Sequence, residues 1–208
     1  MKRNDYTQAL NELSATEGVF TTAQAQALGI PRNVLAKACE SGKLIRIIQG
    51  AYRMAGTPAS QLDDLAAIWK LTCPSKLTHE RMPAEAWDGI TIAGSTAASI
   101  LGIGDFYLSP YRILAPMRIN SRNNMVKFGI RKVSRDDVTF IDSIPVTKVE
   151  RTLVDLVLDN EDPSLIQDAL ADARIKGLNK DRLKHLIANA HVSKAMNIKL
   201  EILLGKEY

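Results

Sequence analysis

Hydrophobic residues near the start of the chain recur at the spacing of an amphipathic helix. The positions are Tyr6, Ala9, Leu10 and Leu13. They predict a first helix over Asp5–Thr16 that ends before Gly18. Further along, apolar and small residues on either side of Gly29 predict two more helices, Ala23–Leu28 and Pro31–Ser41.

Cap and turn residues order this region as helix, turn, helix and hairpin. Thr21 and Gln24 have the spacing of a capping box, and Gly29 permits the positive φ of a tight turn. Gly42 then ends the second of these helices. Two short strands are expected around Gln49-Gly50, namely Leu44–Ile48 and Ala51–Met54. This order predicts a winged helix-turn-helix domain over residues 1–56.

The helix Pro31–Ser41 would be the recognition helix of such a domain. Arg32, Asn33 and Lys37 lie off its apolar stripe in the half that reaches base edges, so we expect them to read DNA bases. Residues expected to hold the phosphate backbone are Thr22, Lys43, Arg46, Gln49 and Arg53. Two other interpretations stay open, which are solvated surface charge and a winged helix that docks a protein.

The rest of the chain predicts a second, mixed domain. Small residues with Gly and Pro at Ala55–Ser60 suggest a boundary, and a linker helix is expected over Gln61–Thr72, within residues 57–74. Residues 75–208 would then form the second domain. Its expected strands are Ile90–Ile92, Tyr111–Ala115, Val126–Val133, Val138–Phe140 and Ile144–Val146. Its expected helices are Ser95–Leu101, Lys148–Leu158 with a capping box from Thr147 to Glu150, and three more beginning near Asp162, Asn179 and Ser193. The predicted fold class is therefore α+β.

A second basic stretch lies between Arg112 and Arg135, which contains no acidic residue. Alternation would place Lys127, Gly129 and Arg131 on one, solvent-facing side of a strand. Such a surface would attract a polyanion, whether RNA, DNA or an acidic protein, unless it only keeps an edge strand soluble. The residues of this candidate patch are Arg118, Arg122, Lys127, Arg131, Lys132 and Arg135.

Net charge and the absence of catalytic motifs together favour a nucleic-acid-binding protein over an enzyme. The net charge of +4 favours a nucleic-acid partner, and the two cysteines give no disulfide framework, as expected in the cytoplasm. We expect no membrane segment and no signal peptide. His79, His185 and His191 are scattered, and neither metal-ligand spacing nor a nucleophile or phosphate-loop motif is present. No catalytic residue, metal or cofactor is therefore expected, and Arg151 and Asp155 are interpreted as an i, i+4 ion pair.

Two segments resemble the AbiEi family of antitoxins, from type IV toxin–antitoxin and abortive-infection systems. The first runs from Gly18 to Arg53 and carries ALG at 27–29, GKLIR at 42–46 and GAYR at 50–53. The second is IPVTKVERTLVDL, Ile144–Leu156, and the small-residue segment Ser95–Gly102 adds to the likeness. The resemblance implies a phage-defence antitoxin that binds operator DNA through its winged helix and represses its own operon. It also implies that the C-terminal domain counteracts a nucleotidyltransferase-like toxin, with or without direct binding.

Some proteins with this N-terminal arrangement continue into a nuclease domain, but the helical residues after Leu156 carry no strand-borne acid cluster. The alternative function is a winged-helix transcriptional regulator without a toxin, whose second domain senses a ligand or a protein. A pure interaction module, in which the basic stretch binds RNA or an acidic protein, also stays open. The segment 76–89 has no interpretation at this level.

Overall fold

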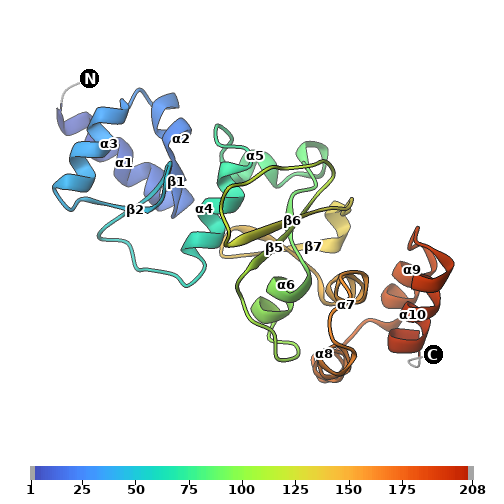
Figure 1. Ribbon diagram of the computed structural model, residues 1–208. Coiled ribbons are helices and arrows are strands. Elements are labelled where there is room, and N and C mark those ends of the chain that lie inside the picture. Colours follow the sequence, from blue (N-terminus) through green and yellow to red (C-terminus); the bar gives the residue numbers. More distant parts are fainter. Residues whose placement is uncertain (1–2, 206–208) are drawn as a thin grey trace. The chain divides into compact units, whose positions relative to one another are not determined.

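The computed structural model describes residues 3–205 and divides the chain into two compact units (Figure 1). The first unit contains the residues up to Asp88 together with Asp142–Ile144, and the second contains Gly89–Ile141 and Pro145 onwards. The fold is α+β, as the sequence predicted, and each unit contains one small sheet.

The first unit begins as the predicted winged helix-turn-helix. Its elements are α1 (Arg3–Glu17), β1 (Phe20–Thr21), α2 (Thr22–Ala27), α3 (Arg32–Glu40), β2 (Leu44–Ile48) and β3 (Ala51–Met54). The strands form an antiparallel sheet in the order β1-β3-β2. Apolar residues of all three helices pack together with Phe20, Leu44 and Tyr52 in one core. The strand β1, which the sequence analysis missed, therefore completes a three-stranded wing.

This unit extends well past residue 56, where the sequence suggested a boundary. Helix α4 (Asp63–Leu71) contributes Ala67 to a small core with Val19 and Ala51. The short elements α5 (Thr78–Arg81) and η1 (Ala84–Ala86) follow it. Because α4 buries its apolar side against the wing strands, it forms part of the first unit and does not act as a free linker.

A buried polar cluster fixes α4 and α5 to α1. The carboxylate of Glu17 accepts hydrogen bonds from the Lys70 ammonium and from the Thr78 hydroxyl, the latter at 2.6 Å. The side chains of Glu17 and Lys70 are only 3% and 2% exposed. Burial raises the pKa of Glu17, but hydrogen bonds from Lys70 and Thr78 outweigh it and hold that pKa below its ordinary value. Through Thr78, the cluster gives part of the segment 76–89 a structural role.

The second unit is built around a five-stranded mixed sheet. Its strands are β4 (Thr91–Ile92), β5 (Tyr111–Ala115), β6 (Val126–Ile130), β7 (Val138–Ile141) and β8 (Ile144–Thr147), and their order is β6-β5-β4-β8-β7. Strands β5 and β6 run parallel, whereas β4 is antiparallel to β5 and parallel to β8. The predicted strand Val126–Val133 ends earlier, at Ile130. The short turn η2 (Arg135–Asp137) precedes β7.

Helices cover this sheet and continue into a helical end (Figure 1). They are α6 (Gly94–Leu101), α7 (Val149–Leu158), α8 (Pro163–Ile175), α9 (Lys180–Ala188) and α10 (Lys194–Leu204). Leu153, Leu156, Leu170, Leu183 and Leu200 are all buried in one core that α7–α10 share with α6. The last three helices begin where the sequence predicted, and Asp162, Asn179 and Ser193 cap them.

The predicted capping box from Thr147 to Glu150 is wrong. Lys148 is the N-cap of α7 and makes no side-chain cap. The hydroxyls of Thr147 and Thr152 bond to each other at 2.7 Å, and Glu150 accepts a hydrogen bond from the backbone N–H of Asn179. Thr147 therefore bonds within the first turns of α7, whereas Glu150 is engaged by a residue 29 positions away, and neither forms the predicted capping box.

Candidate nucleic-acid interface

A groove of about 420 Å³ lies between the recognition helix α3 and the wing. Four of the residues expected to contact DNA line it, and they come from α2, α3, β2 and the turn between β2 and β3. They are Thr22, Arg32, Arg46 and Gln49. Asn33 is exposed on α3 outside this groove. The fold thus brings together residues that lie up to 27 positions apart in the chain.

Local caps and turns hold this groove in shape. Thr21 and Gln24 form the predicted capping box at the start of α2, with the Gln24 N–H 3.1 Å from the Thr21 hydroxyl. The next residue, Thr22, donates its backbone N–H to the carbonyl of Gly50 at 2.9 Å, which ties α2 to the wing turn. Gly50 has φ of 90°, a conformation that favours glycine. The wing turn is therefore fixed beside the start of α2.

Tyr52 forms part of the floor of the groove, and the sequence analysis did not single it out. It is only 7% exposed, and the guanidinium of Arg46 lies 5.8 Å from its ring centroid. An arginine over an aromatic face loses fewer orientations when it binds a phosphate. The GAYR motif contained this residue, but nothing in the motif indicated that it would support Arg46.

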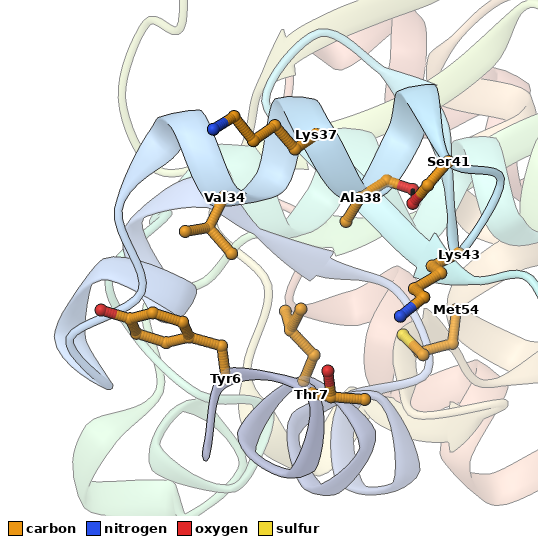
Figure 2. A pocket seen from close by; sticks show the side chains of 9 residues that line it. Tyr6, Thr7, Val34, Lys37, Ala38, Ser41, Lys43 and Met54 are labelled. Atoms are coloured by element: carbon orange, nitrogen blue, oxygen red, sulfur yellow. Dashed lines mark hydrogen bonds between the residues drawn. The ribbon is translucent and has the colours of Figure 1, made fainter. Parts of the chain in front are cut away.

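Lys37 and Lys43 line a different cavity, on the other side of α3 (Figure 2). This cavity has a volume of about 460 Å³ and lies between α1 and α3. Figure 2 shows Val34 and Ala38 pointing from α3 toward the Tyr6 side, and Lys43 reaching in near Met54. Both lysines are exposed. The predicted contacts therefore divide between two flanks of α3.

Arg53 does not belong to either surface, which corrects its expected role on the DNA backbone. Its side chain is 7% exposed, and its Nε lies 2.9 Å from Asp63 Oδ2 at the start of α4. Its guanidinium also donates to the carbonyl of Thr57. Because these groups are already bound inside the unit, Arg53 stabilises the junction of the wing with α4 and is not exposed to a phosphate.

The charge of this region matches a polyanion. Within residues 18–56 the sequence holds five arginines and lysines, and Glu40 is the single acidic residue. Four of the five cations are exposed, namely Arg32, Lys37, Lys43 and Arg46. The single acid lies at the C-terminal end of α3, away from the half that would meet base edges.

The basic stretch of the second unit is not the open basic face that the sequence suggested. Arg131 pairs with Asp155 of α7 at 2.9 Å and with Asp159, the C-cap residue of that helix, at 3.0 Å. Arg112 also binds Asp159, through two contacts of 2.6 and 2.7 Å. The strand face that carries Gly129 and Arg131 is therefore turned toward acids of α7.

The remaining members of the candidate patch differ in exposure. Arg118, Arg122, Lys127 and Lys132 are exposed, whereas Arg135 is half-buried with its guanidinium 4.8 Å from the Phe140 ring.

The ion pair between Arg151 and Asp155 forms as predicted, at 3.1 Å. The sequence could not show that Asp155 also accepts from Arg131, because these residues are 24 positions apart.

No group of three or more histidine, cysteine, aspartate or glutamate residues is arranged to hold a metal in the part of the chain that the structure describes. Over the same residues, every helix is too short or too polar to cross a membrane.

Comparison with protein families gives a match over the N-terminal region. Residues 8–55 match the family described as "Transcriptional regulator, AbiEi antitoxin", and the match covers most of α1, the helix-turn-helix and the wing. The resemblance to AbiEi antitoxins with an N-terminal DNA-binding domain is thereby confirmed, and the matched domain is that of a DNA-binding transcriptional regulator. No curated protein matched the chain.

The fold of nearly the whole chain recurs in a solved structure, the RV2827C protein from Mycobacterium tuberculosis. The similarity covers 96% of this chain and 76% of that chain, with a TM-score of 0.56. Sequence identity is 16%, so the likeness concerns the fold alone.

Proposed function

We propose that this protein is the antitoxin of a type IV toxin–antitoxin system of the abortive-infection kind, acting in the cytoplasm. Its winged helix binds operator DNA upstream of its own operon and represses transcription. Its second unit counteracts a nucleotidyltransferase-like toxin encoded beside it, directly or by acting on the same target. The proposal is supported by the family match over residues 8–55 and by the groove that collects Thr22, Arg32, Arg46 and Gln49.

Under this proposal, the residues of the groove and of the exposed part of α3 would have different roles in DNA binding. Arg32, at the start of α3, is placed to pair with a base edge, and the exposed Asn33 and Lys37 would extend the contact along the same helix. Arg46, Gln49 and Thr22 would hold phosphates on either side. The exposed Lys43 adds a phosphate contact beyond the end of α3. Arg53 is left out of this set, because it is buried in its ion pair with Asp63.

Binding to the DNA just upstream of the gene tests the first half of the proposal. Fluorescence anisotropy would compare that duplex with a scrambled duplex of the same composition at two salt concentrations. We expect tighter binding to the upstream duplex, and Arg32→Ala should reduce this preference at one base pair by about 1–3 kcal/mol. Arg174→Ala, an exposed arginine of α8 in the second unit, serves as the matched control.

Equal affinity for both duplexes that falls steeply with salt would overturn operator recognition, because only phosphates would then be contacted. The second half needs a growth test. Co-expression with the nucleotidyltransferase-like product of the adjoining gene should relieve its toxicity. A specific operator with no such neighbour would instead identify a transcriptional regulator without a toxin.

A further inference from the structure

The sheet of the second unit ends in a strand whose outer side is open. Strand β6 pairs with β5 in parallel register, from Tyr111 opposite Val126 to Ala115 opposite Ile130, and no further strand lies beyond it in the described chain. The Tyr111 N–H donates to the Met125 carbonyl, and the Arg131 N–H donates to the Ala115 carbonyl. Odd-numbered residues of β6 therefore direct their backbone groups to β5.

The backbone N–H and C=O groups of Phe128 and Ile130 consequently point away from the sheet, because alternate residues of a strand face opposite sides. Val126 is partly accounted for, since its N–H donates to the Asn123 carbonyl. A row of open backbone donors and acceptors is what an added strand requires.

Exposed apolar side chains mark this edge and not the opposite one. Ile130 and Met117 are each 68% exposed, and Met125 is 47% exposed. By contrast, the four residues of β7, the other edge strand, are buried or half-buried. Met117, Ile119, Phe128 and Ile130 line a groove of about 460 Å³ beside the edge. The edge at β6 therefore exposes apolar side chains that an added strand could cover.

The charged side chains of the chain segment that contains β6 are all basic, although Asp155 and Asp159 neutralise Arg112 and Arg131. Arg118, Arg122, Lys127 and Lys132 are all exposed, and no acidic residue occurs from Arg112 to Arg135. Lys127 points to one face of the strand, whereas Phe128 and Ile130 point to the other. An added strand would alternate in the same way, so acidic residues would meet Lys127 and apolar residues would meet the groove.

We propose that β6 is a docking edge for an extended protein segment in which acidic and apolar residues alternate, bound by strand addition. The proposal concerns the second unit alone and does not depend on operator binding. A protein segment fits better than a nucleic acid because the open groups are strand-spaced amides and carbonyls, beside a groove that the side chains of Met117, Phe128 and Ile130 help to line. A nucleic-acid backbone would use only the four exposed cations and would leave the open backbone groups of β6 without partners.

A synthetic peptide of about nine residues with alternating Glu and Val tests the proposal on the full-length protein. The first control is the same peptide N-methylated at alternate backbone amides, which keeps charge and side chains but removes strand hydrogen bonds. The second is single-stranded oligothymidine, a polyanion without amides. We expect measurable binding of the plain peptide and at least about tenfold weaker binding of the N-methylated one.

Amide hydrogen exchange locates the contact. Bound peptide should slow exchange at Phe128 and Ile130 by about tenfold or more, while Lys127 and Gly129 should change little because β5 already protects them. Ile130→Pro should weaken binding, since proline is tolerated at an outward N–H of an edge strand but removes the donor. Ile130→Val is its matched control.

The doubly reversed Lys127→Glu, Lys132→Glu protein should bind the peptide at least about fivefold more weakly, and Lys194→Glu on α10 should not. The N-methylated peptide and the hydrogen-exchange measurement use the unaltered protein, so they decide between strand addition and simple charge attraction even if the proline variant fails to fold. Equal binding of the plain and N-methylated peptides, or preference for oligothymidine, would show a simple polyanion surface and overturn the proposal. So would the absence of peptide binding or of protection at Phe128 and Ile130.

Discussion

Arg131 on the segment after β6 and Asp155 on α7 form an ion pair of 2.9 Å in which the carboxylate side chain is fully buried. Arg151 holds the same carboxylate from the previous turn of α7. The pair converts what alternation suggested was an exposed basic face into the contact between a strand and a helix. It also limits the exposed charge of this region to residues around the β6 edge.

Loss of Arg131 should destabilise the second unit. Arg131→Ala leaves a buried carboxylate with one guanidinium fewer, and we expect a loss of about 1–3 kcal/mol in the free energy of unfolding at neutral pH. Urea unfolding followed by circular dichroism measures it. The neighbouring exposed Lys132→Ala should change stability by less than about 0.5 kcal/mol. Equal effects of the two variants would contradict the ion pair.

The cost of Arg131→Ala should shrink as the pH falls. Burial raises the pKa of Asp155 above its unfolded value, and Arg151 and Arg131 oppose this. Removing Arg131 raises that pKa further. A carboxyl with a raised folded pKa weakens the fold fully above that pKa, and protonation relieves the cost below it. The difference between wild type and variant should therefore be smaller near about pH 4 than at pH 7.

Gly129→Ala should be destabilising although its backbone is ordinary. A Cβ at this position would lie 2.5 Å from Arg112 Nη1, and Arg112 is held by two contacts to Asp159. The guanidinium must move out of that pair, so we expect a loss of about 1–3 kcal/mol by urea unfolding. Gly56→Ala, which meets nothing within 4 Å, is the matched control and should be neutral or slightly stabilising.

The winged helix was predictable because its signals are local. The Thr21–Gln24 box, Gly29, Gly42 and the wing turn at Gly50 each act within a few residues, and the strands Leu44–Ile48 and Ala51–Met54 fall where the sequence placed them. Strand β1 has only two residues, which are too few to show the alternation of apolar and polar positions that predicts a strand. It is recognised only by its pairing with β3.

Partners distant in the chain decided the rest. Arg53 looked like any wing arginine until α4 supplied Asp63, and Lys37 could be placed on α3 but not on one of its two flanks. Glu17, Lys70 and Thr78 form one buried cluster across more than 60 positions. Charge patterns predict which residues attract a polyanion, but only packing shows which of them are already neutralised.

Lys43 and Arg53 should respond differently when each is replaced by alanine. Losing Lys43, an exposed phosphate contact under the proposed function, should weaken binding to all duplexes alike and lower the salt slope by about one unit. Arg53→Ala should leave the slope unchanged and reduce the stability of the first unit, because its ion pair with Asp63 is lost. Anisotropy at several salt concentrations and tryptophan fluorescence in urea separate these effects. A lower salt slope for Arg53→Ala would contradict its assignment to the interior.

The Glu17 cluster should make the first unit sensitive to acid. The folded pKa of Glu17 lies below its ordinary value of 4.5, since its hydrogen bonds from Lys70 and Thr78 outweigh burial. Its contribution to stability is therefore complete above the unfolded pKa and is lost as the pH falls through the folded pKa.

Trp69 and Trp87 both belong to this unit, so tryptophan fluorescence in urea reports its unfolding. The stability gap between wild type and Glu17→Gln should be widest at neutral pH, where the variant leaves Lys70 without its carboxylate, and should narrow below about pH 4. Glu12→Gln, on the exposed side of α1, should show no such gap. A gap that stayed constant down to acid pH would mean that Glu17 is not ionised in the folded protein.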